Sequence, residues 1–196
     1  TDRWVEIVTT AHEVGLRSSS TVMYGHIESE HHIAAHLELL RSIQKQTGGF
    51  TEFVPLGFIP WKTSLYREQG SRAGATTPED LRLVAVGRLF LRPWIQNIQI
   101  SWVKMGPRVG QVALMSGAND FGGTLMEESI SAAAGSEHGD NLEATEIERL
   151  IRDIGRVPYE RTTTYGRRSR DAEAPGRESP PPPSEQPVHL AVGSGY

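Results

Sequence analysis

The segment from Gly117 to Thr124 combines polar side chains with small residues in a way that could bind a substrate. It reads GANDFGGT, so Asn119 and Asp120 lie among glycines and alanine. Exposed backbone N–H groups in such a segment bind anions or polyols, and the two side chains add a hydrogen-bond donor and a carboxylate. An Asx turn punctuated by glycine is the plainer alternative. We predict that Asn119 and Asp120 bind substrate.

A second group, Gly25, His26 and Glu28, directly follows a β-prone run from Ser18 to Tyr24. A glycine at the carboxyl end of a strand lets a planar ring approach the backbone, and parallel barrels carry their active sites at that end. His26 stands just past the strand, where it could hydrogen-bond a substrate. The spacing alone favours a plainer reading, in which Gly25 turns the chain and Glu28 begins a helix.

The neighbouring histidines do not predict a metal site. Glu28, His32 and His36 share one face of a helix at four-residue spacing. The HExxH pattern of zinc proteases is absent, however, and no third histidine or carboxylate is placed to complete a site. We predict no metal ligand in this chain and interpret these histidines as solvated or hydrogen-bonded.

Trp102 is a further candidate, in a predicted strand from Asn97 to Val103. In a strand, Trp102 and Lys104 share one face while Ser101 and Val103 share the other. Trp102 would either stack on an aromatic substrate or pack against a helix. We predict it as a substrate-binding residue, with both alternatives open.

The long irregular segment from Pro55 to Thr76 carries the aromatic residues Phe58, Trp61 and Tyr66. A loop of this length is usually functional or disordered, and its aromatic content favours function. These rings would line a pocket and exclude water, or they would only pack.

Composition excludes several classes of protein. The 196 residues are 37% hydrophobic and 22% charged, which is typical of a globular protein, and the net charge of −4 argues against nucleic-acid binding. No apolar run is long enough to cross a bilayer and no signal peptide opens the chain, so we expect a cytoplasmic protein without membrane contact. The absence of cysteine excludes disulfides and thiolate-held iron–sulfur clusters on this chain.

Helical and strand patterns alternate along the chain. Amphipathic spacing and capping residues predict helices at 1–15, 28–46, 77–91, 107–116, 127–134 and 142–154. Strands are predicted at 18–24, 50–54, 97–103 and 118–121. The stretch 166–196 is rich in proline and charge and poor in large apolar residues, which predicts a disordered tail.

This alternation predicts an α/β protein with a parallel sheet or barrel. Four strand–helix units are too few for a closed eight-stranded barrel of about 250 residues, and they would leave unpaired edges. We therefore expect residues 1–165 to be the C-terminal half of a (βα) barrel whose N-terminal half is missing.

Several motifs in order resemble a known family. They are MYGHIE at 23–28, QKQTGGFTEFVPLGFIP at 44–60, SWVKMG at 101–106, GANDFGGTLMEESI at 117–130 and IRDIGRVPYERTTTY at 151–165. The chain resembles radical S-adenosylmethionine enzymes, specifically the tyrosine-using subunit of FO synthase, called CofH when separate. The likeness extends over residues 1–165.

The resemblance implies a TIM-like barrel, S-adenosyl-L-methionine and a 4Fe-4S cluster held by a CxxxCxxC loop. Its substrates would be L-tyrosine and 5-amino-6-(D-ribitylamino)uracil, joined during coenzyme F420 biosynthesis. It also implies that Gly25 and Glu28 contact the adenine of the cofactor, although Thr21 and Met23 depart from the family's GxIxGxxE-like pattern. No cluster ligand and no catalytic residue can be assigned to a chain without cysteine.

Two alternatives to this function stay open. One is a futalosine-pathway enzyme of menaquinone synthesis, either aminofutalosine synthase or the later cyclase. The other is a non-catalytic half-barrel subunit that needs a partner with the cluster. In each case we expect the chain alone to be inactive.

Overall fold

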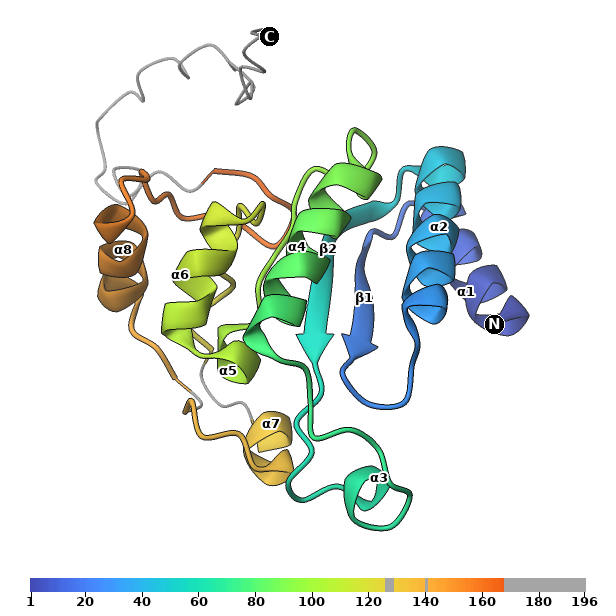
Figure 1. The fold of residues 1–196 in the computed structure, drawn as a ribbon. Helices are drawn as coiled ribbons and strands as arrows, with labels where there is room; N and C mark the ends of the chain where they lie inside the picture. The colour runs from blue at the N-terminus through green and yellow to red at the C-terminus, as the bar shows by residue number, and fades with distance from the viewer. Residues whose placement is uncertain (126–128, 140, 168–196) are drawn as a thin grey trace, which may run out of the picture. The chain divides into compact units, whose positions relative to one another are not determined.

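The computed structural model describes residues 1–125, 129–139 and 141–167. Figure 1 shows a small parallel sheet with its helices. The elements are α1 (Asp2–Glu13), β1 (Ser18–Tyr24), α2 (Glu30–Thr47), β2 (Phe50–Gly57), α3 (Ser64–Arg67), α4 (Thr77–Leu91), α5 (Trp102–Met105), α6 (Pro107–Met115), α7 (Ser129–Ala134) and α8 (Ala144–Asp153). All of them belong to one compact unit, Thr1–Pro158. No helix among the described residues is long and apolar enough to cross a membrane.

Capping residues set the bounds of the two helices that flank the site. Helix α2 begins after Ser29, whose side chain and that of His32 form a capping box, and it ends at Gly48 in a left-handed conformation. Helix α4 begins after Thr76, which forms a second capping box with Glu79. Capping side chains satisfy the backbone N–H groups that a first helical turn leaves free. The predicted helices at these positions are confirmed.

The sheet is parallel and follows chain order. Strands β1 and β2 pair in parallel, with Thr21 opposite Val54 and Tyr24 opposite Gly57. Single parallel bridges then join Phe53 to Ile98 and Gln99 to Asp120. Four extended segments therefore lie in the predicted order, but only the first two are regular strands.

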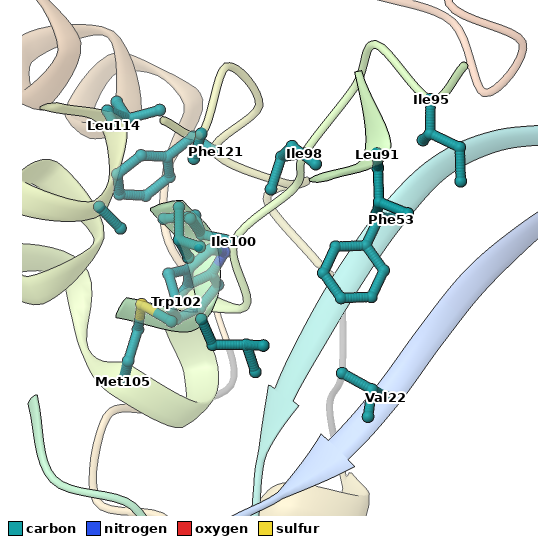
Figure 2. Packing of buried hydrophobic residues seen from close by; sticks show 14 of the residues in the cluster. Val22, Phe53, Leu91, Ile95, Ile98, Ile100, Trp102, Met105, Leu114 and Phe121 are labelled. Carbon is teal, nitrogen blue, oxygen red and sulfur yellow. The ribbon is translucent and has the colours of Figure 1, made fainter. Parts of the chain in front are cut away.

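The apolar side chains of the sheet pack against the helices. Alternate residues of β1, Val22 and Tyr24, are buried, whereas Met23 between them is 55% exposed. Phe53, Ile98 and Ile100 extend this buried face, and Figure 2 shows them beside Leu91 and Trp102. Helix–sheet packing thus explains why one face of β1 is buried, while its other face is exposed.

Two predicted strands are wrong in part. Residues 97–103 do not form a strand, because the chain makes only the bridges at Ile98 and Gln99 and then turns into α5 at Trp102. Residues 118–121 are likewise reduced to the bridge at Asp120. The physical reason is tertiary: Ile100 and Trp102 reach the buried cluster through an extended segment that changes to a helix, which strand alternation could not reveal.

The predicted loop from Pro55 to Thr76 is also shorter than expected. Strand β2 continues to Gly57, and α3 lies within the segment. The residues between Pro55 and Gly57 pair with Val22, Met23 and Tyr24, so the partner strand sets their conformation.

Residues from Tyr159 onward form a separate unit. Its described part is a tight turn, in which Arg161 and Arg167 form an antiparallel bridge and the guanidinium of Arg161 lies over the ring of Tyr165. The predicted disordered tail lies outside the described residues, apart from Gly166 and Arg167. The domain boundary at residue 165 stays a prediction.

Candidate functional site

The turn after β1 is closed by the carboxylate of Glu28. The backbone N–H of Gly25 donates to Oε1 of Glu28 at 2.5 Å, and the N–H of His26 donates to Oε2 at 2.9 Å. The three residues singled out from the sequence are therefore in direct contact. Glu28 lies before the first residue of α2, so its side chain shapes the turn and not the helix.

The charge of Glu28 is stabilised by backbone N–H groups. Burial on its own would raise the pKa of this carboxyl, but hydrogen bonds from the backbone of Gly25, His26 and Glu28, together with the charge of His26, outweigh burial. The pKa of Glu28 consequently lies below its usual value. The carboxylate is a permanent part of the turn at neutral pH.

Gly25 has a left-handed backbone conformation and leaves no room for a side chain. Its φ is +89°, and a Cβ built on it would lie 2.5 Å from the backbone nitrogen of Ala75 and 2.9 Å from the carbonyl carbon of Gly74. The space that a side chain would need is filled by the chain's own loop. Residues 74–75 therefore lie close to the backbone at Gly25, and the contact of this turn with the adenine ring stays a prediction.

His26 has one ring nitrogen committed and the other without a partner among the described residues. Its Nδ1 accepts a hydrogen bond from the N–H of Ile27 at 2.7 Å and lies 3.3 Å from Oε2 of Glu28. The ring meets Phe58 edge to face with centroids 5.7 Å apart. These contacts orient the ring with Nε2 available at this end of β1, and the contact of His26 with substrate stays a prediction.

A buried pair beneath the turn was missed by the sequence analysis. Tyr24 and Asp80 are only 4% and 9% exposed, and the hydroxyl of Tyr24 donates to Oδ1 of Asp80 at 2.6 Å. Burial, followed by the charge of Asp80, raises the pKa of Tyr24, and burial also raises the pKa of Asp80. The bond fixes the end of β1 to the first turn of α4. An acidic residue in the first turn of a helix gave no signal beyond the helix dipole.

Trp102 lies in the core. It is 2% exposed, and its indole N–H donates to the carbonyl oxygen of Gly123 at 2.9 Å. Figure 2 shows it between Ile100 and Met105. These contacts agree with the alternative in which Trp102 packs in the core. Trp102 is the first residue of α5, so it does not share a strand face with Lys104.

Asn119 has a structural set of contacts at some distance from the turn. Its Oδ1 accepts from Nη2 of Arg88 at 2.6 Å and from the N–H of Ile98 at 2.8 Å. Ile98 pairs with Phe53, which lies four residues before Gly57 at the end of β2. A strand rises about 3.3 Å per residue, so Asn119 lies roughly 13 Å from the turn along the strand direction. The structure does not bring Asn119 to Gly25 and His26.

Asp120 makes the Asx turn that was the plainer alternative. Its Oδ1 accepts from the N–H of Gly122 at 2.9 Å, and Gly122 has a φ of +90°. The adjacent Phe121 is buried in the core, whereas Asp120 is only half-buried. The contact of Asp120 with substrate stays a prediction.

The three aromatic residues after β2 separate into two environments. Phe58 is 8% exposed and contacts His26, whereas Trp61 is 53% exposed and meets Tyr66 edge to face. The N–H of Lys62 donates to the carbonyl oxygen of Ala134, which ties this loop to α7. Phe58 belongs to the site, whereas Trp61 and Tyr66 contact each other.

The donor set limits which cofactors this chain can hold. No group of three His, Cys, Asp or Glu side chains among the described residues could bind a metal ion. His36 binds the carbonyl oxygen of Thr21, and His32 caps α2. With no cysteine in the sequence, the chain does not fit an iron–sulfur cluster.

Comparison with known proteins places this chain in a family. Residues 47–174 match the family described as the CofH/MqnC C-terminal region. The "5-amino-6-(D-ribitylamino)uracil--L-tyrosine 4-hydroxyphenyl transferase" of Methanothermobacter thermautotrophicus is 53% identical over 165 residues, which are 84% of this chain and 45% of that protein. The "FO synthase" of Mycobacterium tuberculosis is 54% identical over 165 residues, 84% of this chain and 19% of that protein.

A transferase of the same name from Methanococcus maripaludis is 48% identical over the same number of residues, 46% of its length. The chain thus spans less than half the length of these curated relatives. It belongs to the CofH/MqnC C-terminal region family, and its similarity to FO synthases is of the CofH type.

Proposed function

We propose that this chain is the C-terminal part of the barrel of a radical S-adenosylmethionine transferase of the FO synthase type. The transferase would join the hydroxybenzyl group of L-tyrosine to 5-amino-6-(D-ribitylamino)uracil. The observation that carries this proposal is 48–54% identity over 165 residues to proteins that bear this activity in their names. Four parallel segments in chain order, with one face of β1 open, are consistent with one side of a barrel.

The cluster must be supplied from outside this sequence. A 4Fe-4S cluster needs thiolates, and the 196 residues contain none. We propose that a polypeptide region equivalent to the rest of the longer relatives provides it. The transferase would then be active only when that region and this chain are assembled.

The turn at Gly25–Glu28 is the proposed place for the nucleoside of S-adenosylmethionine. Two of its N–H groups are committed to Glu28, but the carbonyl oxygens of Gly25 and Ile27 have no donor among the described residues. Such oxygens suit the exocyclic amino group of adenine. When bound and reductively cleaved, S-adenosylmethionine supplies the radical that attacks tyrosine. The turn would hold the nucleoside in place, and Glu28 would act by shaping the turn.

His26 and Asp120 are the proposed substrate contacts of this chain. The Nε2–H of His26 would donate to a substrate oxygen, and Phe58 would hold the imidazole in orientation. Asp120 would accept from ribityl hydroxyls or from an amine. Trp102 would act indirectly, by fixing the segment after Ile100.

A menaquinone-pathway reaction is the second candidate, because the matched family is described by both CofH and MqnC. The two functions use the same turn and differ in their substrates. Product analysis therefore separates them.

The experiment is reconstitution. The N-terminal region of the Methanothermobacter transferase is co-expressed with this chain, loaded with iron and sulfide, and given S-adenosylmethionine, a reductant, L-tyrosine and the aminouracil. We expect mass spectrometry to detect the hydroxybenzyl adduct of the aminouracil and 5′-deoxyadenosine, and neither component alone to form the adduct. An assembly that carries its cluster and cleaves S-adenosylmethionine, yet never modifies the aminouracil, would refute the proposal.

A further inference from the structure

The loop 72–76 lies against the Gly25–Glu28 turn through its backbone. The N–H of Arg72 donates to the carbonyl oxygen of His26 at 2.9 Å. A Cβ at Gly25 would collide with the backbone of Gly74 and Ala75, which lie in direct contact with it. The loop therefore leaves the turn no room to move toward it.

The same loop also contacts the end of β2. Gly74 has a φ of +94°, and a Cβ there would lie 3.0 Å from the carbonyl oxygen of Phe58. The N–H of Phe58 in turn donates to the carbonyl oxygen of Tyr24 at 2.8 Å. The ends of both strands and the turn thus share one packing partner.

An ion pair anchors this loop to α4. Nη2 of Arg72 lies 2.7 Å from both carboxylate oxygens of Glu79. Oε2 of Glu79 also accepts from the N–H of Thr76 at 2.7 Å and from its hydroxyl at 2.8 Å. One carboxylate therefore fixes both ends of the loop, at residues 72 and 76.

We infer that Arg72 is a positioning residue, which through its ion pair with Glu79 holds the Gly25–Glu28 turn in the conformation that receives the nucleoside. This inference rests on the proposed function for the identity of the ligand. Arg72 touches neither cofactor nor substrate in this role. Its effect is transmitted through its own backbone N–H and through residues 74–75.

Arg72→Gln tests the inference in the chain itself. The side chains of Arg72 and Glu79 are 46% and 35% exposed, so their ion pair contributes little to stability. We therefore expect only a moderate effect, in which the amides of Gly25 and His26 exchange with deuterium roughly two- to five-fold faster. The dissociation constant for S-adenosylhomocysteine, measured by calorimetric titration without any cluster, should rise by a similar factor. Arg72→Lys should restore most of the amide protection and most of the affinity, because only one guanidinium nitrogen contacts the carboxylate.

Arg149→Gln is the matched control. It removes another exposed arginine, whose pairs with Glu146 and Asp153 lie within α8, and it should leave both readouts unchanged. Unchanged exchange at Gly25 and His26 in Arg72→Gln would overturn the inference alone. Faster exchange with unaltered affinity would overturn it too, because the pair would then be only structural. A wild-type chain that binds no S-adenosylhomocysteine would instead remove the cofactor assignment in the proposed function, and the inference with it.

Discussion

The hydroxyl of Tyr24 donates a 2.6 Å hydrogen bond to the carboxyl of Asp80, and this bond joins the end of β1 to the start of α4. Both residues are buried. A buried carboxyl that loses its only described donor keeps the cost of its desolvation. The pair thus links the candidate site to the core beneath it.

Tyr24→Phe is expected to lower the free energy of unfolding by about 1–3 kcal/mol, because Asp80 stays buried without its donor. Urea unfolding followed by circular dichroism measures the change. Tyr66→Phe serves as the control, since the described contact of Tyr66 is the edge-to-face one with Trp61, which Phe retains. Equal stability of Tyr24→Phe and wild type would show that the hydrogen bond makes no net contribution to the free energy of unfolding.

Gly25→Ala should destabilise the chain more than Gly15→Ala. Both glycines have nearly the same positive φ, +89° and +86°, so both variants incur the strain of a left-handed alanine, about 1–2 kcal/mol. At Gly15 nothing lies within 4 Å of the new Cβ, whereas at Gly25 it meets backbone atoms. The difference between the two unfolding free energies isolates the contact with residues 74–75. Identical losses would mean that the loop moves aside freely.

Stability should fall as the pH drops below neutral because of His12. His12 is buried, it bonds to Thr47 and Ser18, and its burial lowers its pKa. The unfolded chain then takes up a proton near pH 6.5 that the folded chain does not, so folding is favoured above that pH and loses free energy as the pH falls toward the lowered pKa.

Thermal melting between pH 7.5 and 5.5 measures this effect. We expect His12→Gln to melt lower at pH 7.5 and to depend less on pH. Replacement of the exposed His31 by Gln should leave the pH dependence of the melting temperature unchanged. A His12→Gln profile parallel to that of wild type would contradict the assignment.

Trp102→Ala should cost about 3–5 kcal/mol of stability, because it empties a fully buried site and removes the bond to Gly123. Replacement of Trp94, which is 45% exposed, should cost much less. Chemical unfolding of the two variants compares them. A small loss for Trp102→Ala would restore the substrate-stacking alternative.

The sequence alone determined the local elements and the family. Ser and Thr caps, a glycine at the end of α2 and apolar spacing gave the helices, and the run Ser18–Tyr24 gave β1, because these signals act within a few residues. The motifs around Gly25, Trp102 and Asp120 identified the family for the same reason: they are contiguous. The absence of cysteine also settled, without coordinates, that the chain holds no thiolate cluster.

The tertiary structure decided which of these residues lie together and why. Gly25 and Ala75, or Tyr24 and Asp80, are separated by some fifty residues, so no local pattern could relate them. Residue type predicted that Asn119 and Trp102 bind substrate. In the structure, Asn119 accepts a hydrogen bond from Arg88 and Trp102 donates one to Gly123, and both partners are distant in the sequence. Burial and long-range packing are properties of the whole fold, and they place Gly74 and Ala75 against Gly25, which no local pattern indicated.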